Sequence, residues 1–350
     1  MKILHLVKTN TGARWALQQI TVLQQLGVDV VVALPSATAG LAPEYRKAGA
    51  TVVGADLDFT ASDPRQLGRA LRVCRALVDG VQPDLIHSHF VSTTLVARLA
   101  LGRAHPTPRV FQVAGPLHLE HRLFAALDRL SAGPADFWIG SCRWTCARYR
   151  QLGVPAPRVF LSYYGTRPKH LQGAPRGTLR REFGLDRRAA LVGVVAHIYA
   201  PKRYLGQQRG LKGHEDFLDA IHRAAPEHPA LHGMVVGGPW GDAAAYATRL
   251  RARAEGLPVT FTGARSDIAA VYADLQVAVH PSLSENCGGA VESLAAGVPT
   301  IATNVGGLPD VVIDGDTGWL VPPHAPAHLA AVLLDVLRHP LEARRRARRG

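Results

Sequence analysis

Short runs of β-branched and apolar residues alternate with amphipathic segments along nearly the whole chain, and this alternation restricts the fold more than any other feature. The first run, 3–7, is followed by a segment of helical periodicity at 15–26 and a second apolar run at 28–34. Such alternation predicts parallel strands joined by helices that cover both faces of a sheet. Further strands of the first half are expected at 84–87, 109–113, 136–139 and 158–161.

Glycine, proline and basic residues interrupt this alternation between 164 and 176, a composition typical of a linker. Beyond it we expect strands at 190–196, 231–236, 258–261, 277–280, 300–302 and 319–321, and helices at 212–225, 243–254 and 326–337. We therefore predict an α/β protein with two doubly wound Rossmann-like domains, 1–165 and 177–340, joined by a linker at 166–176 and followed by a basic tail at 341–350. Ligands of such sheets bind beyond the carboxyl ends of the strands, so the ligand is expected in a cleft between the two domains.

Charge and cysteine content narrow the class of ligand and the compartment. The chain has 40 Lys and Arg against 27 Asp and Glu, a net charge of +13 that favours anionic ligands. It has no zinc finger, RNP aromatic motif or basic heptad helix, so no nucleic-acid partner is expected. Four scattered cysteines, the lack of a basic apolar leader and the lack of a long apolar run favour a cytoplasmic protein with reduced thiols. Basic helices in the first half leave peripheral contact with an anionic membrane open.

The most informative segment runs from 281 to 300, PSLSENCGGAVESLAAGVPT. Gly288 and Gly289 are predicted to open a helix that Gly297 ends. The free N–H groups and the dipole at such a helix start favour an anion. Glu285 and Glu292 flank that start, and carboxylates accept hydrogen bonds from vicinal sugar hydroxyls. The segment therefore predicts a site for a sugar joined to a phosphate.

This segment, continued through 301–310 (IATNVGGLPD) and 315–322 (GDTGWLVP), resembles the donor-binding half of retaining GT-B glycosyltransferases of family 4. The resemblance implies that 177–340 binds a nucleotide sugar and that 1–165 binds the acceptor. It also implies that Glu285 contacts the donor sugar and Glu292 the nucleotide ribose. The family usually has seven residues between these glutamates, whereas this chain has six, so that Ser284 occupies the strict register of the first one.

A second motif, KGHE at 212–215, follows a long polar loop and resembles the Lys-Gly of the family, which clamps the donor diphosphate together with an arginine. Lys212 matches the lysine by position. The arginine position is His197, or it is taken over by the longer loop, which holds Lys202, Arg203 and Arg209. A diphosphate that leaves without a metal needs fixed cations, which Lys212 with Arg209 or Arg203 would supply, so no metal or other cofactor is expected. The same resemblance implies that Gly238 lies at the phosphates and Arg265 at the nucleobase.

The first half lacks the GxGxxG motif of a dinucleotide site and has Gly12-Ala13 where the family often has two glycines. The resemblance implies that Gly12, Arg14, His89 and His121 contact the acceptor. His87 and His89 follow a strand, but no acidic or third ligand lies near them in the sequence, so we predict no metal there.

A histidine commonly follows the next strand in this family, close to the reacting sugar, and Ala114 takes its place here. His118, Glu120 or His121 could replace it, and we expect His118 to act as a catalytic group. An imidazole can hold an acceptor hydroxyl or a sugar oxygen at neutral pH.

We therefore predict a retaining, metal-independent glycosyltransferase that uses a nucleotide sugar, and we expect a UDP-sugar. Composition and the segments 115–121 and 201–206 are also similar to glycosyltransferases of aminoglycoside antibiotic pathways, which would make the acceptor an aminocyclitol. The other acceptor class is a glycan, such as a cell-surface polysaccharide precursor. Two alternatives stay open: a GT-B-like sugar-nucleotide epimerase, and an inactive nucleotide-sugar-binding protein, which the missing histidine at Ala114 favours.

Overall fold

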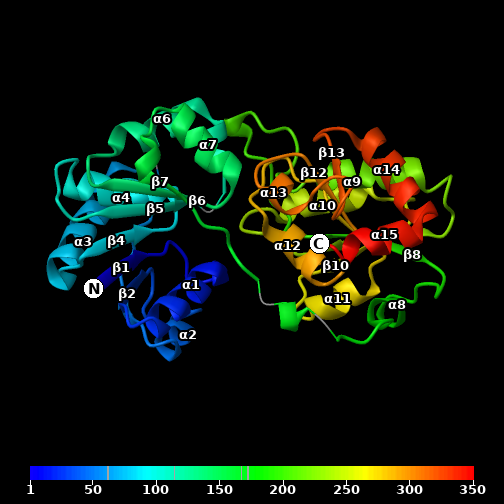
Figure 1. Cartoon of the computed structure of the whole chain (residues 1–350), viewed down its shortest axis with the longest axis horizontal. Helices are drawn as coiled ribbons and strands as arrows, with labels where there is room; N and C mark the ends of the chain where they lie inside the picture. Colours follow the sequence, from blue (N-terminus) through cyan, green and yellow to red (C-terminus); the bar gives the residue numbers. More distant parts are fainter. Residues whose placement is uncertain (61–62, 114, 167, 172) are drawn as a thin grey trace. The chain divides into compact units, whose positions relative to one another are not determined.

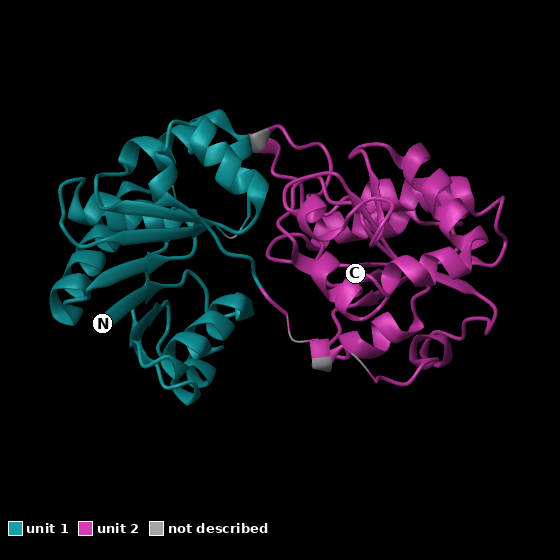
Figure 2. Ribbon diagram, viewed as in Figure 1, with its two compact units in different colours: residues 1–164 teal, residues 165–350 magenta. Residues whose placement is uncertain are grey.

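The computed structural model divides the chain into two compact units, Met1–Tyr164 and Gly165–Gly350 (Figure 2). It describes residues 1–60, 63–113, 115–166, 168–171 and 173–350. The boundary between the units falls next to the segment that the sequence marks as a linker, of which residues 167 and 172 lie outside the described part.

Unit 1 is built on a parallel sheet of seven strands in the order β3-β2-β1-β4-β5-β6-β7 (Figure 1). The strands are β1 Lys2–Leu6, β2 Asp29–Leu34, β3 Thr51–Gly54, β4 Leu85–Ser88, β5 Arg109–Val113, β6 Asp136–Gly140 and β7 Val159–Leu161. Between them lie the helices α1 Arg14–Gln25, α2 Ala42–Lys47, α3 Pro64–Val81, α4 Val91–Leu101, α5 Leu117–Glu120, α6 Arg122–Ser131 and α7 Arg143–Gln151. Separate apolar clusters pack α1 and α2, and α3 and α4, against the strands, so that these central strands are buried on both faces.

Unit 2 contains a second parallel sheet, of six strands in the order β10-β9-β8-β11-β12-β13. Its strands are β8 Ala190–Val195, β9 Leu231–Val236, β10 Val259–Gly263, β11 Val277–His280, β12 Thr300–Thr303 and β13 Trp319–Val321. Its helices are α8 Thr178–Glu182, α9 His214–Ala224, α10 Ala244–Arg253, α11 Ile268–Asp274, α12 Gly288–Ala295, α13 Leu308–Val311, α14 Pro326–Arg338 and α15 Pro340–Ala347. In each sheet the chain first adds strands outward on one side of its first strand, β1 or β8. It then returns and adds the following strands on the other side, starting with β4 or β11, which is the topology of a doubly wound fold.

The C-terminal segment 341–350, predicted as a basic tail, is largely helical. Residues Pro340–Ala347 form helix α15, whose Ala343 and Ala347 are buried. The guanidinium of Arg346 lies 4.4 Å from the centre of the Trp319 ring and pairs with Glu342 at 2.8 Å. Arg344, Arg345 and Arg348 are exposed, whereas Arg346 and the two alanines pack on the unit.

A buried ionic network holds the helices of unit 1 to its sheet. Arg98 of α4 contacts Asp128 of α6 at 2.6 Å and Asp136 of β6 at 2.9 Å, and Arg109 of β5 contacts Asp136 at 2.7 Å. Burial alone would raise the pKa of Asp128, but its hydrogen bond with His118 and the charge of Arg98 bring that pKa well below its ordinary value. The carboxylate therefore stays ionised inside the core.

No helix in the described part of the chain is both long enough and apolar enough to cross a bilayer.

Candidate functional site

The segments that carry the predicted donor residues meet at the carboxyl ends of the strands of unit 2. The loop after β11 lies between the loop after β8 and the loop after β12. Leu283 donates its backbone N–H to the carbonyl of Leu211 at 2.8 Å, and Thr303 donates its hydroxyl to the carbonyl of Ser282 at 2.6 Å. These bonds connect three loops that are distant in sequence.

Two glycines allow this close approach. Gly213 and Gly306 both have positive φ, 66° and 53°. A Cβ at Gly213 would overlap the carbonyl of Pro281, and a Cβ at Gly306 would overlap the carbonyl of Glu285. Any side chain at either position would push the central loop away from its neighbour.

Lys212 and Glu285 form an ion pair at this junction. Glu285 also accepts hydrogen bonds from the Ser282 hydroxyl at 3.1 Å and from the Asn286 N–H at 3.0 Å. Burial by itself would raise the pKa of Glu285, but the Lys212 ammonium and these donors outweigh it and lower that pKa. The pair is charged, mostly buried and held in a fixed position.

Helix α12 begins directly beside this pair at Gly288, as predicted. A Cβ on Gly289 would lie 3.0 Å from the His280 ring and 3.4 Å from the carbonyl of Val195, so glycine lets the helix start pack on the ends of β8 and β11. The His280 ring contacts the Ser293 hydroxyl at 2.9 Å, and burial lowers its pKa to about 4. His280 is therefore a neutral support beneath the helix start.

Glu292 lies one turn inside α12, where the Tyr272 hydroxyl donates to its Oε2 at 3.4 Å. Burial raises the pKa of Glu292, and the hydrogen bond from Tyr272 reduces that effect. Within the described residues no cation forms an ion pair with Glu292. Its carboxylate is therefore half-buried with only a long hydrogen bond among the described residues. Because its oxygens have free lone pairs, it can accept further hydrogen bonds from a ligand.

The two arginines considered as a second cation have different surroundings. Arg209 forms ion pairs with Asp216 and, at 3.4 Å, with Asp219, both on α9. Arg203 lies in the short 3₁₀ helix Arg203–Leu205 and is exposed. The two carboxylates of α9 offset most of the charge of Arg209, so Arg203 is more available than Arg209 as a cation for the diphosphate.

Arg265 and Gly238 lie near each other at the ends of β9 and β10. A Cβ on Gly238 would be 3.3 Å from that of Ala264, the residue before Arg265. The Arg265 guanidinium pairs with Glu182 and with Asp267, both at 2.8 Å. These two carboxylates hold the Arg265 guanidinium in place. A ligand would therefore contact only those atoms of the Arg265 side chain that the carboxylates do not cover.

A group of aromatic rings, of which the sequence indicated only His197, lies at the same end of the sheet. The rings of His197 and Trp240 are 4.9 Å apart, and Tyr199 lies 6.4 Å from His197 and 6.3 Å from Trp240. Burial raises the pKa of Tyr199, the charge of Lys212 lowers it and the charge of Glu285 raises it. Aromatic residues directly after the strands 190–196 and 231–236 are the signal in the sequence that would have indicated this group.

The predicted acceptor residues of unit 1 are spread over several elements. Gly12 has a φ of 71° just before α1, and Arg14, the first residue of α1, pairs with Glu44 at 3.0 Å. His121 precedes α6 and its ring lies 5.1 Å from that of Phe124. Ala114 lies outside the described residues. His89 is fully buried beside His5 and His87.

His118, expected as a catalytic group, lies in the core of unit 1. Its Nε2 is 3.2 Å from Asp128 and 3.1 Å from the Tyr149 hydroxyl, and its ring packs 5.5 Å from that of Phe111. Because the imidazole belongs to the buried network around Asp128, its position favours a structural role over contact with a substrate. The sequence could not reveal this, since Asp128 and Tyr149 are 10 and 31 residues away.

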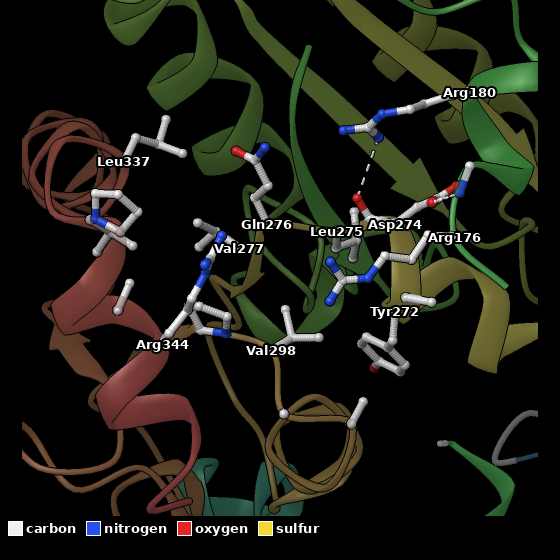
Figure 3. Close-up of a pocket in the computed structure, with 18 residues that line it drawn as sticks. Arg176, Arg180, Tyr272, Asp274, Leu275, Gln276, Val277, Val298, Leu337 and Arg344 are labelled. Atoms are coloured by element: carbon white, nitrogen blue, oxygen red, sulfur yellow. Dashed lines mark hydrogen bonds between the residues drawn. The ribbon is translucent and has the colours of Figure 1, made fainter. Parts of the chain in front are cut away.

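A cavity of about 680 Å³ lies elsewhere in unit 2, beside the amino ends of β11 and β12 (Figure 3). Arg176, Arg180 and Arg344 line it together with Asp274, which accepts the backbone N–H of Leu179 at 2.7 Å. The lining that the structure describes includes none of Lys212, Glu285 and Glu292. This cavity and the predicted donor site are therefore at opposite ends of the strands.

Two doubly wound sheets in separate units, with polar loops at the strand ends, define the GT-B class of fold. Solved structures of that class match the whole chain. Sucrose-phosphate synthase from Thermosynechococcus elongatus matches with a TM-score of 0.80 and 20% identity, over 100% of this chain and 92% of that one. HepE of Anabaena, solved in complex with UDP-glucose, matches with a TM-score of 0.79 and 20% identity, over 100% and 93%.

Two family models match the chain: "Glycosyl transferase 4-like domain" at residues 11–165 and "Glycosyl transferases group 1" at residues 204–339. The chain belongs to this glycosyltransferase family. A D-inositol 3-phosphate glycosyltransferase of Thermomonospora curvata is 33% identical over 283 residues, 75% of this chain and 59% of that protein. The one from Streptomyces coelicolor is 31% identical over 292 residues, 73% and 62%. The aligned part thus spans about 60% of the length of these relatives.

Proposed function

We propose that this protein is a retaining glycosyltransferase that moves a sugar from a UDP-sugar to a hydroxyl group of the acceptor. The observation that carries the proposal is the Lys212–Glu285 ion pair beside the glycine-opened start of α12. Membership of the family and the likeness to a structure in complex with UDP-glucose support the same donor class.

In the proposed mechanism the acceptor oxygen bonds to the anomeric carbon on the face from which the diphosphate leaves. The bond from that carbon to the phosphate oxygen breaks, and the acceptor proton passes to the departing phosphate. Lys212, Arg203 or Arg209, and the N–H groups of Gly288 and Gly289 stabilise the negative charge that develops there. Glu285 would hold the donor sugar and Glu292 the ribose hydroxyls.

No protein nucleophile takes part in this mechanism, and no metal is needed at the diphosphate. Lys212 is already paired with Glu285, which keeps its side chain ordered before the donor binds. Such fixed charges lower the reorganisation that the reaction requires.

The acceptor is proposed from the relatives and from composition. The relatives are D-inositol 3-phosphate glycosyltransferases, which makes a phosphorylated cyclitol the first acceptor to test. An aminocyclitol and a polysaccharide precursor are the other two acceptors to test. We also propose that the reaction takes place in the cytoplasm.

The test is an assay with a panel of UDP-sugars, with and without D-inositol 3-phosphate, an aminocyclitol or a glycan precursor. We expect UDP release that depends on one acceptor and a product that keeps the anomeric configuration of the donor. Interconversion of UDP-sugars without transfer would instead indicate an epimerase, and tight UDP binding with no turnover would indicate a binding protein. An inverted product would contradict the proposed mechanism.

A further inference from the structure

Three histidines of unit 1 come together from segments more than 80 residues apart. His5 on β1 and His87 on β4 are register partners on neighbouring parallel strands, so they lie on the same face of the sheet. His89 follows β4 two positions after His87. His5 and His89 are 0% exposed and His87 is 5% exposed.

The three rings lie in contact. Their centres are 4.7 Å apart for His5 and His87, 5.2 Å for His5 and His89, and 4.3 Å for His87 and His89. The His5 Nδ1 is 2.9 Å from the His89 Nε2. One ring nitrogen from each histidine can be chosen so that all three nitrogens lie within 4.8 Å of one another.

Each histidine also has a buried ring nitrogen without a hydrogen-bond partner among the described residues. These atoms are Nε2 of His5, Nε2 of His87 and Nδ1 of His89. Leaving a buried polar atom without a hydrogen-bond partner destabilises a protein. Three such atoms in one cluster indicate a missing partner rather than a packing detail.

The chemistry of the three side chains also suits a metal. Imidazole nitrogens offer lone pairs, which suit divalent zinc, cobalt, nickel and copper. Three histidines with an open fourth position are a known ligand set for zinc.

Two further residues lie beside the cluster. Gln112 on β5 lies close enough to His87 to influence its ring, and the Gln112 Oε1 is buried without a hydrogen-bond partner among the described residues. That oxygen could accept a hydrogen bond from a metal-bound water. Trp15 packs 5.2 Å from the His89 ring and covers the cluster.

We propose that His5, His87 and His89 bind one divalent transition-metal ion, Zn²⁺ or Co²⁺, with a water molecule as the fourth ligand. Zinc–nitrogen bonds of about 2.0 to 2.1 Å place tetrahedral ligand atoms roughly 3.3 Å apart, so modest rotations of the three side chains suffice. All three histidines belong to unit 1, whereas Lys212 and Glu285 belong to unit 2. The proposed site revises the prediction of no metal at His87 and His89, which rested on the lack of a third ligand nearby in sequence.

The test uses untagged, chelator-treated full-length protein titrated with Co²⁺ and followed by its visible absorption, with Zn²⁺ as competitor. We expect one ion per chain and the intense spectrum of tetrahedral Co²⁺. His5→Gln, His87→Gln and His89→Gln should each weaken binding by about 100-fold or more. His232→Gln is the matched control, since His232 is half-buried on β9 and hydrogen-bonded to Thr260. The metal affinity of this variant should not change.

X-ray absorption of the zinc-loaded wild-type protein keeps the proposal testable if the variants do not fold. Three imidazole shells around the metal are expected. Binding that stays unchanged in all three variants, or a metal shell with fewer than three imidazoles, would overturn the site. A wild-type protein that binds no ion at micromolar concentrations would overturn it as well.

Discussion

The opposite charges of Lys212 and Glu285 are in contact at the point where the donor phosphates are expected. The ion pair restricts the conformations of both side chains. Removing the ammonium would leave Glu285 mostly buried without a cation, while the other donors to its carboxylate, Ser282 and Asn286, would remain. The loss should fall on the step in which charge develops on the diphosphate, because a preorganised cation stabilises the transition state more than the ground state.

Lys212→Ala is therefore expected to lower kcat by about 100- to 1,000-fold and to change donor affinity much less. Steady-state kinetics and calorimetric titration with UDP measure the two quantities. Arg181→Ala, an exposed cation of α8, is the control and should alter neither. A loss of donor affinity with kcat unchanged would mean that Lys212 only binds.

Glu292→Gln tests the ribose contact. A charged acceptor for hydroxyl donors contributes about 1.5 to 3 kcal/mol, so UDP affinity should fall by roughly 10- to 150-fold. Glu227→Gln, on the surface with Arg338 as its partner, is the control. Unchanged UDP affinity in Glu292→Gln would remove this residue from the donor site.

At the scale of elements, the strands and the glycine-opened helix could be predicted because their signals are local. The runs 109–113, 231–236 and 277–280 match β5, β9 and β11, and α12 begins at Gly288 as its two glycines indicate. Helix α15 was missed because its arginine-rich sequence hides a buried alanine face. The short strand β3 has half-buried and exposed residues only, so its hydrophobic signal is weak.

Side-chain environments that depend on distant elements could not be predicted from one sequence. His5 completes the histidine cluster from β1, and Asp128 of α6 draws His118 into the core. Neither contact has a local pattern. Lys212 and Glu285 were identified only because each belongs to a motif of its own.

If His118 has a structural role, its replacement should affect how stably α5 and α6 are packed in unit 1. His118→Gln should lower the melting temperature of unit 1, because it removes a partner of Asp128 and Tyr149 inside the core. kcat should stay within about threefold of the wild-type value. A loss of kcat of two orders of magnitude with an unchanged melting temperature would restore the catalytic role.

For the whole molecule, buried neutral histidines predict how stability depends on pH. The pKa of His280 is lowered to about 4 by burial, whereas an unfolded chain has a histidine pKa of about 6.5. The unfolded state therefore takes up a proton between pH 6.5 and 4 that the folded state does not. The contribution of His280 is complete above pH 6.5 and decreases by up to about 1.4 kcal/mol for each pH unit below it.

Urea unfolding at pH 7, 6 and 5 measures this contribution. His280→Gln should show a shallower loss of unfolding free energy with falling pH than the wild-type protein. His328→Gln, an exposed position on α14, should keep the wild-type slope. Identical slopes in all three proteins would mean that His280 does not couple folding to protons.

The most direct test of the account is a crystal structure of the protein with UDP or an intact UDP-sugar. We predict the diphosphate against Lys212 and the N–H groups of Gly288 and Gly289, with the ribose hydroxyls on Glu292. A nucleotide bound instead in the cavity lined by Arg176, Arg180 and Arg344, with Lys212 still paired to Glu285 and no phosphate beside it, would contradict the proposed donor site.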